Sequence, residues 1–166
     1  MNKKIVTLFA LLITITLLTA CSSNNENFET ESSVRELEKT YIHSSYEIEL
    51  LDLVNGYRVS KGLIPLEIIQ HISYKGSQHN DYMIVTNSVN HDGFDERKMN
   101  LQQVLGAYRV GENVAYGFAS AQATMNAWIN SEAHRNNLMG DYTHFGISIK
   151  EDANGKKYYT NMYIKK

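Results

Sequence analysis

The sequence contains a single cysteine, Cys21, among its 166 residues. One cysteine cannot form an internal disulfide, so a disulfide framework cannot stabilise this fold. Positive charge is not in excess, because the chain has 16 lysine and arginine residues against 18 aspartate and glutamate residues. A nucleic-acid-binding protein needs a basic surface, so this balance argues against a nucleic-acid partner. It also argues against electrostatic docking to anionic lipid.

An apolar run near the N-terminus is too short to cross a bilayer. It covers residues 5–18, "IVTLFALLITITLL", which is fewer than the ~18 residues that a membrane span needs. The run follows the basic "MNKK" and precedes the small residues of "LTAC". This layout is typical of a secretory signal, so we expect residues 1–20 to be a cleaved signal peptide. An uncleaved N-terminal anchor is the alternative.

The segment "LTAC" at 18–21 resembles a bacterial lipoprotein box. In such a protein, cleavage precedes the cysteine and its sulfur carries lipid, here palmitate or a similar acyl group on Cys21. Acylation accounts for the lone thiol, and each buried CH₂ of an acyl chain contributes about 0.8 kcal/mol to membrane binding. An ordinary cysteine inside a signal peptide is the alternative. We therefore expect an extracytoplasmic protein, anchored to a bacterial membrane through Cys21.

The rest of the chain divides into a tether and one domain. Residues 22–33, "SSNNENFETESS", are polar and acidic and cannot bury enough apolar surface to fold alone. We expect a tether at 21–45 and a folded domain at 46–166. No internal repeat is visible, and 166 residues suffice for one domain with its own core.

Hydrophobic spacing predicts four helices followed mainly by strands. The expected helices cover residues 46–63, 65–85, 96–106 and 120–131, and the expected strands cover 109–117, 144–150 and 157–165. Asn154 and Gly155 between the last two strands are a strong hairpin-turn signal. Ser120 is the expected N-cap of the fourth helix. This order predicts an α+β fold, with helices layered on a small, mainly antiparallel sheet.

Four of the six histidines do not need a functional role to explain their positions. We expect His43 and His71 to be exposed, because the first precedes the folded part and the second lies off the apolar face of its helix. His79 lies on the apolar face of the second helix, where it is either a hydrogen-bonded contact or part of a site. His144 starts a strand, and we assign it no role.

Two other residues, His91 and Glu112, lie at positions that are typical of functional sites. His91 lies in "VNHDGF", a loop built from turn-forming residues, and loops often carry function. Glu112 follows Gly111, which allows a close backbone approach or a sharp bend. The alternative for Glu112 is a structural hydrogen bond to nearby backbone amides.

The stretch "NSEAHRNN" at 130–137 contains an acid and a histidine two positions apart. We expect the fourth helix to end near Asn130 or Ser131, because these residue types favour caps and turns. Beyond that end, the spacing of two can place Glu132 and His134 on one side, and Arg135 would then point away, free to pair with an acid elsewhere. A helix-end acid and a histidine at the negative end of the helix dipole are the alternative.

Taken together, these stretches resemble the CAP superfamily, the SCP-like domain of cysteine-rich secretory, antigen 5 and pathogenesis-related proteins. The bacterial branch is the nearer match. The matching motifs are "HNDYM" at 79–83, "HDGF" at 91–94, "GENVAYG" at 111–117, "WINSEAHRNNL" at 128–138, and the strands "FGISI" and "YYTNMY". The resemblance covers residues 47–166, and several motifs in the right order make it specific.

The resemblance implies an α-β-α sandwich and a pocket with two histidines and two acids. Carried over onto this sequence, the pocket residues are His91, Glu112, Glu132 and His134. His79, Asn113 and Arg135 are expected to support them from outside. The disulfides of the eukaryotic branch cannot exist here. Enzymatic activity in the family is unsettled, and several eukaryotic members bind lipids or sterols.

Two neutral imidazoles and two carboxylates would attract a divalent cation, and nitrogen and oxygen donors suit Zn²⁺. The first hypothesis is a module that binds a metal and an unknown small ligand, lipid, glycan or peptide. The second is a peptidase or esterase that uses water, with Glu112 and His134 as catalytic residues, because no side-chain nucleophile is evident. The third is a scaffold in which the polar cluster holds loops together.

Overall fold

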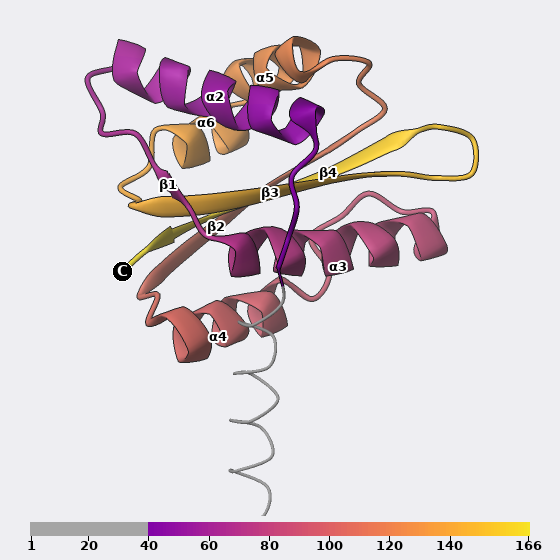
Figure 1. Cartoon of the computed structure of the whole chain (residues 1–166), viewed down its shortest axis with the longest axis horizontal. Coiled ribbons are helices and arrows are strands. Elements are labelled where there is room, and N and C mark those ends of the chain that lie inside the picture. Colours follow the sequence, from indigo (N-terminus) through magenta and orange to yellow (C-terminus); the bar gives the residue numbers. More distant parts are fainter. Residues whose placement is uncertain (1–39) are drawn as a thin grey trace, which may run out of the picture.

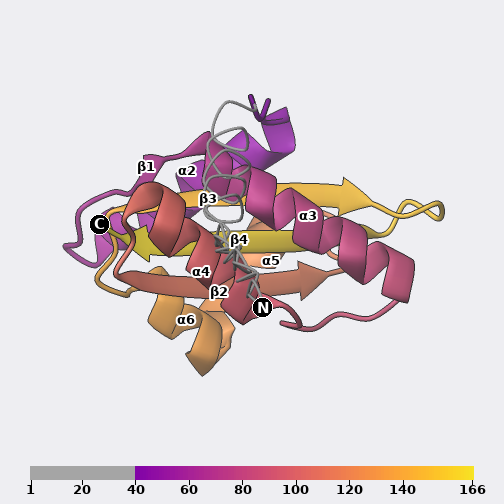
Figure 2. The ribbon, with the colours of Figure 1, turned by 90° about the horizontal axis from the view of Figure 1, so that it is seen from below.

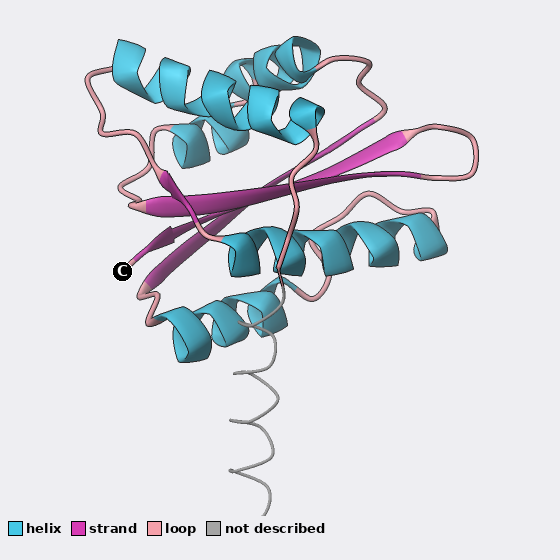
Figure 3. Cartoon of the chain, viewed as in Figure 1, coloured by secondary structure: helices cyan, strands magenta, loops and turns pink. Residues whose placement is uncertain are grey.

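The structure is a computed structural model that describes residues 40–166. The domain has three layers, with a four-stranded sheet between two layers of helices (Figures 1 and 3). This confirms the predicted α-β-α sandwich. The predicted signal peptide, Cys21 and most of the predicted tether lie outside the described residues. In the described part, no helix is long and apolar enough to span a membrane.

The sheet has the strand order β1-β3-β4-β2. Its strands are β1 (Glu67–Ile68), β2 (Arg109–Tyr116), β3 (His144–Glu151) and β4 (Lys157–Lys165). β4 pairs antiparallel with both β2 and β3, while the short β1 runs parallel to β3. The sheet is therefore mainly antiparallel, as predicted, and β2 is one of its two edges.

One face of the sheet is covered by α2 (Ser45–Ser60), α5 (Ala121–Asn130) and α6 (Glu132–Leu138) (Figure 1). The core between these helices and the sheet contains Trp128 and Tyr163, both fully buried. Ser120 caps α5 by accepting a hydrogen bond from the Ala123 amide at 3.1 Å, which confirms the predicted N-cap.

The opposite face is covered by α3 (Gln70–Thr86) and α4 (Phe94–Leu105), which lie in front of the sheet in Figure 2. Ile72 of α3 and Leu101 of α4 pack there against Met162 of β4. This layer holds the second and third predicted helices, so the chain covers one face with α2, crosses to the other for α3 and α4, and returns for α5 and α6.

The α2 helix begins with a capping box, in which Ser44 and Glu47 satisfy each other's backbone amides. Glu47 is buried and also accepts hydrogen bonds from the Tyr41 hydroxyl and the Ile149 amide, both at 2.7 Å. The segment 41–45 is therefore in contact with the domain, just before the boundary predicted at residue 46.

Three elements differ from the prediction. The second helix begins at Gln70 rather than Pro65, because residues 67–68 are extended and pair with β3. The third helix begins at Phe94, two residues earlier than expected. After α5 ends at Asn130, the chain forms the additional helix α6 instead of an extended segment.

Two histidines are less exposed than predicted. His71 is 2 % exposed, and its Nε2 lies 2.8 Å from the Asn100 Oδ1 of α4. His43 is half-buried, with its Nε2 2.8 Å from the Ser73 hydroxyl of α3. Both predictions were wrong because each residue was judged without the neighbouring segment that covers it. The expected His144 position, at the start of a strand, is confirmed.

Candidate functional site

The site forms around β2, where successive side chains point to opposite faces of the sheet. Val110 and Val114 belong to the apolar clusters on the α3 and α4 side, so Glu112 between them points to the same side. Asn113 points to the other face, where its side-chain amide donates to the His134 carbonyl of α6 at 3.1 Å. One edge strand thus connects both helical layers.

Glu112 is buried and clamped by an arginine from α4. Its side chain is 1 % exposed, and that of Arg97 is 9 % exposed. The guanidinium donates from Nε to one carboxylate oxygen and from Nη2 to the other, both at 2.8 Å. A bidentate pair of this geometry fixes both the position and the orientation of the carboxylate. Since the two charges cancel, Glu112 adds little net charge to the site.

His91 lies against the same carboxylate. Its Nδ1 is 2.8 Å from Glu112 Oε1, and because the carboxylate can only accept, Nδ1 carries the proton. The His91 side chain is 51 % exposed, so its other ring nitrogen, Nε2, is directed away from Glu112 and keeps a lone pair free. A carboxylate behind one imidazole nitrogen fixes the tautomer and orientation of the ring.

The loop that carries His91 is held at both ends. The Asp92 amide donates to the Asn90 side chain at 3.0 Å, and Arg97 Nη1 donates to the Asp92 carbonyl at 2.8 Å. Gly93 then caps α4 with a φ of 70°, a left-handed conformation that glycine adopts readily. Arg97 therefore positions both Glu112 and the backbone next to His91.

His79 lies behind Glu112, on α3. Asn80 donates to the Ser148 carbonyl at 2.8 Å, so its amide oxygen accepts the Thr160 hydroxyl proton at 2.7 Å. Because the Thr160 hydroxyl donates to Asn80, it can only accept from His79, whose Nδ1 lies 3.1 Å away and therefore carries the proton. This chain of bonds fixes the His79 tautomer. Burial lowers the pKa of His79 to about 4, despite a carboxylate oxygen of Glu112 at 3.9 Å.

On the other face, α6 is attached to β2 through asparagines. Asn137 donates to the Glu112 carbonyl at 3.0 Å and to the Asn113 side chain at 2.9 Å. His134 is one turn before Asn137 and therefore lies on the same side of α6. Burial lowers the pKa of His134, and the charge of the nearby His91 lowers it further.

A cavity of about 330 Å³ opens at this point. It is lined by His91, Phe94, Val110, Gly111, Glu112 and Asn137, and we call it the His91 cavity. A Cβ atom on Gly111 would collide with the Tyr142 hydroxyl and lie 2.7 Å from the Asn137 side-chain oxygen, so any other residue would have to displace these side chains. This is the close backbone approach that the sequence predicted for Gly111.

The expectation that Glu132 and His134 share one side was wrong, because both lie on the helix α6, where residues two apart point in different directions. Glu132 is exposed in the first turn of α6. Arg135 donates to the Ile129 carbonyl at 2.7 Å, and no acid among residues 40–166 forms an ion pair with it.

The four residues predicted to hold a metal do not form a four-ligand site. Among residues 40–166, no group of three or more histidine, cysteine, aspartate or glutamate side chains is placed to hold a metal ion. Glu112 is engaged by Arg97 and His91, and Glu132 points to solvent. His91 lines the His91 cavity. His134 is the other imidazole in its neighbourhood, on the same side of α6 as the lining residue Asn137.

Arg97 is the site residue that the sequence analysis missed. It lies in the charged run "DERK" at the start of α4, which looks like a solvated helix face. The available signal was Glu112 itself, since a lone acid in an apolar strand needs a cation when it is buried. The alternative considered for Glu112, hydrogen bonds to backbone amides, is wrong, because its partners are side chains.

Residues 51–163 match the model of the cysteine-rich secretory protein family, CAP. With the three-layer fold and the site around β2, this match shows that the chain belongs to the CAP family.

The chain is also similar to two proteins of Bacillus subtilis (strain 168). It is 33% identical to the "Uncharacterized membrane protein YlbC" over 135 residues, covering 75% of this chain and 36% of that protein. It is 30% identical to the "Uncharacterized protein YkwD" over 117 residues, covering 66% of this chain and 44% of that protein. The chain therefore spans less than half the length of these relatives.

Two solved structures share the fold. One is an extracellular protein containing an SCP domain from Bacillus anthracis str. Ames, with a TM-score of 0.64 and 28% identity over 73% of this chain and 40% of that one. The other is an outer surface protein from Borrelia burgdorferi, with a TM-score of 0.67 and 18% identity over 75% of this chain and 96% of that one. At that identity, the second likeness shows the fold alone.

Proposed function

We propose that this chain is an extracytoplasmic CAP-domain protein, anchored to a bacterial membrane through lipid on Cys21, that binds a small ligand in the His91 cavity. The apolar run followed by "LTAC" supports the anchor. The extracellular SCP-domain protein of Bacillus anthracis and the membrane protein YlbC are relatives whose names agree with a location outside the cytoplasm.

The observation that carries the binding proposal is the 2.8 Å hydrogen bond between His91 and Glu112. It holds one ring nitrogen of a half-exposed imidazole and leaves the other at a cavity of about 330 Å³. Arg97 immobilises the carboxylate, so the imidazole is oriented before a ligand arrives. A preoriented polar group in a cavity reduces the entropy lost on binding.

Zn²⁺ remains the metal that the donor set would suit, and we propose His91 and His134 as the groups that would hold it. Glu112 would act through His91, as a carboxylate behind a metal-bound imidazole does, and not as a direct ligand. A bound ion would supply Lewis acidity next to the cavity. Glu132, exposed on the first turn of α6, is not needed in this arrangement.

Calorimetric titration of the full chain with Zn²⁺ tests this assignment. We expect a heat of binding that disappears in His91→Ala and in His134→Ala and persists in the control His144→Ala, which removes an imidazole at the start of β3. Unchanged melting in a chelator together with no heat from added Zn²⁺ would refute the metal assignment. A heat that survives both alanine variants would do the same.

A hydrolase is the second candidate, because the same geometry suits a general base. A histidine oriented by a carboxylate, with its other nitrogen free, can take a proton from water. The full chain would then cleave members of a peptide and ester panel, and His91→Ala would abolish the cleavage. No turnover above blank by the wild-type protein would exclude this candidate for the panel tested and leave the binding proposal standing.

A further inference from the structure

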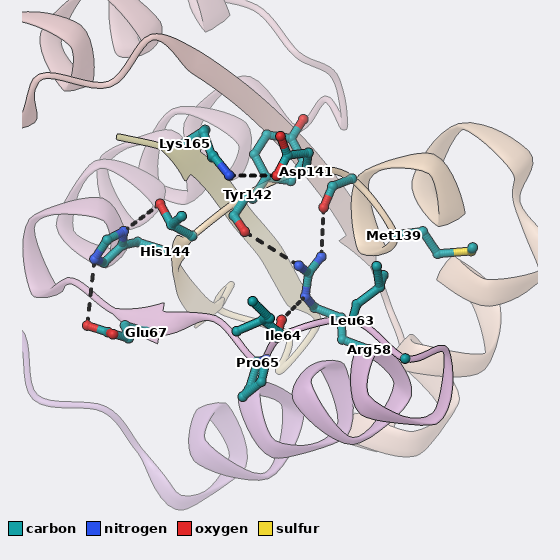
Figure 4. Close-up of a pocket in the computed structure, with 13 residues that line it drawn as sticks. Arg58, Leu63, Ile64, Pro65, Glu67, Met139, Asp141, Tyr142, His144 and Lys165 are labelled. Atoms are coloured by element: carbon teal, nitrogen blue, oxygen red, sulfur yellow. Dashed lines mark hydrogen bonds and ion pairs between the residues drawn. The ribbon is translucent and has the colours of Figure 1, made fainter.

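A second cavity, of about 440 Å³, shares no lining residue with the His91 cavity. It lies where the turn after α2, β1, the segment after α6 and the ends of β3 and β4 meet (Figure 4). Its volume is within the range of ~300–1,000 Å³ that is usual for small-molecule sites. Since Arg58 lies on its wall, we call it the Arg58 cavity.

Arg58 connects the segments that form this cavity. Its Nε donates to the Ile64 carbonyl at 3.1 Å, and its Nη1 donates to the carbonyls of Leu138 and Gly140, both at 2.9 Å. A weaker bond at 3.5 Å runs from Nη2 to the Tyr142 carbonyl. Figure 4 shows the guanidinium between the carbonyl oxygens of Ile64 and Tyr142. The residue is only 2 % exposed, so its positive charge is buried.

No carboxylate among residues 40–166 forms an ion pair with Arg58. Burial lowers the pKa of this guanidinium, but arginine stays protonated in proteins. Carbonyl oxygens satisfy its hydrogen bonds without cancelling a full charge, and buried charges are normally paired. The floor of the cavity therefore keeps a positive charge that an anion would neutralise.

One ion pair at the cavity has its base inside and its acid outside. The side chain of Lys165 is 25% exposed, whereas its partner Asp141, at 2.7 Å, is 72% exposed. His144 lies 3.7 Å from Glu67, but burial lowers its pKa, so it adds no full charge at neutral pH. Exposed pairs such as that of Lys165 and Asp141 are weak, so an incoming anion can replace the acid.

The cavity also has an apolar wall, made by Leu63, Ile64, Pro65 and Met139. Ile64 is 81 % exposed and Met139 is 43 % exposed, although both are large apolar side chains. A ligand with a small apolar group next to its charge would cover them, and burial of this apolar surface would favour binding. Inorganic anions would leave this wall uncovered.

We propose that the Arg58 cavity binds an organic carboxylate that carries a small branched apolar group. The carboxylate lies toward Lys165 and Arg58, and the apolar group lies against Ile64 and Met139. This chemistry occurs both at the C-terminus of a peptide and in a free branched acid. The His91 cavity takes no part, so the two sites can be tested separately.

Three probes separate the contributions to binding. N-acetyl-L-leucine has both the charge and the apolar group, N-acetyl-L-leucinamide lacks only the charge, and 4-methylpentanoate lacks the amide of a peptide. Titration of the isotope-labelled full chain, followed by NMR, should show shifts at Ile64, Thr143 and Lys165 with the first probe and none with the second. A dissociation constant on the order of 1 mM is expected for so small a ligand. Equal affinity for 4-methylpentanoate assigns the free acid, and weaker affinity assigns the peptide C-terminus.

Surface variants give opposite expected effects. Lys165→Gln should weaken binding of N-acetyl-L-leucine about two- to fivefold, and Asp141→Asn should strengthen it by a similar factor, because it removes the competing carboxylate. Lys150 and Asp81 form a matched pair at 2.6 Å outside the cavity. The controls Lys150→Gln and Asp81→Asn should leave the affinity unchanged.

The proposal fails if the amide binds as tightly as the acid, or if none of the three probes shifts the cavity signals. It also fails if folded Asp141→Asn protein binds no more tightly than wild type, or if Asp81→Asn gives the same gain. Dispersed amide signals in each variant establish that the comparison is between folded proteins. All four substitutions are at partly exposed ion pairs, so folding should be retained.

Discussion

The buried carboxylate of Glu112 is stable because Arg97 and His91 provide its hydrogen bonds. The sequence predicted a cluster with two negative charges, but Arg97 cancels one and Glu132 is exposed. Attraction for a cation is therefore weaker than the four predicted residues alone would suggest. What remains for ligand contact is a pair of imidazoles, one of them held by Glu112.

Substitution of Glu112 by Gln should lower the free energy of unfolding by about 3–5 kcal/mol, because it leaves the buried Arg97 without its counter-ion. Urea unfolding at neutral pH measures this change. Glu132→Gln is the control, since that side chain is exposed and its loss should change stability by less than ~0.5 kcal/mol. Equal stability of the Glu112 variant and wild type would show that the clamp contributes nothing to folding.

His79 should make stability depend on pH. Burial lowers its folded pKa to about 4 from an ordinary value of 6.5, so the unfolded chain binds a proton that the folded chain excludes between these values. The free energy of unfolding is therefore highest, as far as His79 is concerned, above pH 6.5, and it decreases as the pH drops toward 4. The His79 contribution to this loss is roughly 3 kcal/mol.

His79→Asn isolates this contribution, because asparagine can still donate to Thr160 but does not titrate. Other histidines with lowered pKa values, including His134 and His144, are present in both proteins and cancel in the comparison. Urea unfolding between pH 7.5 and 4.5 should show a smaller loss of stability in the variant. Parallel curves for the two proteins would contradict the assignment.

At the scale of elements, two glycines differ in the space around them, since one is tightly packed and the other is open. A Cβ on Gly146 of β3 would lie 2.5 Å from the Ser73 amide nitrogen of α3, whereas a Cβ on Gly56 of α2 would meet nothing within 4 Å. Gly146→Ala should therefore destabilise the protein by about 1–3 kcal/mol through overpacking. Gly56→Ala, in an exposed helix interior, should stabilise it by about 0.5–1 kcal/mol. Thermal unfolding of both variants tests the pair, and a loss of stability in Gly56→Ala would contradict it.

The elements with strong periodicity were predictable, and the short ones were not. The recurrence of Ile72, His79 and Met83 at helical steps identified α3, and Asn154 with Gly155 identified the β3–β4 hairpin. β1 has two residues and α6 has seven, too few for a pattern to emerge. Both elements depend on tertiary pairing, with β3 for the first and with β2 for the second.

At the scale of the whole molecule, the order of several motifs along the chain allowed the fold and the family to be predicted together. Part of the site followed, since His91 and Glu112 meet as expected and Asn113 contacts the backbone of His134. Arg97 could not be placed, because its burial arises only when α4 packs beside β2. The Glu132 side chain was misplaced because it lies in the first turn of α6, a helix that the sequence did not predict.

At the scale of the domain, His91 and His134 lie on opposite sides of the sheet. His91 contacts Glu112 of the edge strand β2, and the backbone of His134 contacts Asn113 of the same strand. A crystal structure of the full chain grown with Zn²⁺, with anomalous data at the zinc edge, tests this arrangement most directly. We expect one peak about 2.0–2.1 Å from a ring nitrogen of both His91 and His134, with Glu112 still bound to Arg97. No peak between the two imidazoles, or a zinc ion on Glu112 itself, would contradict it.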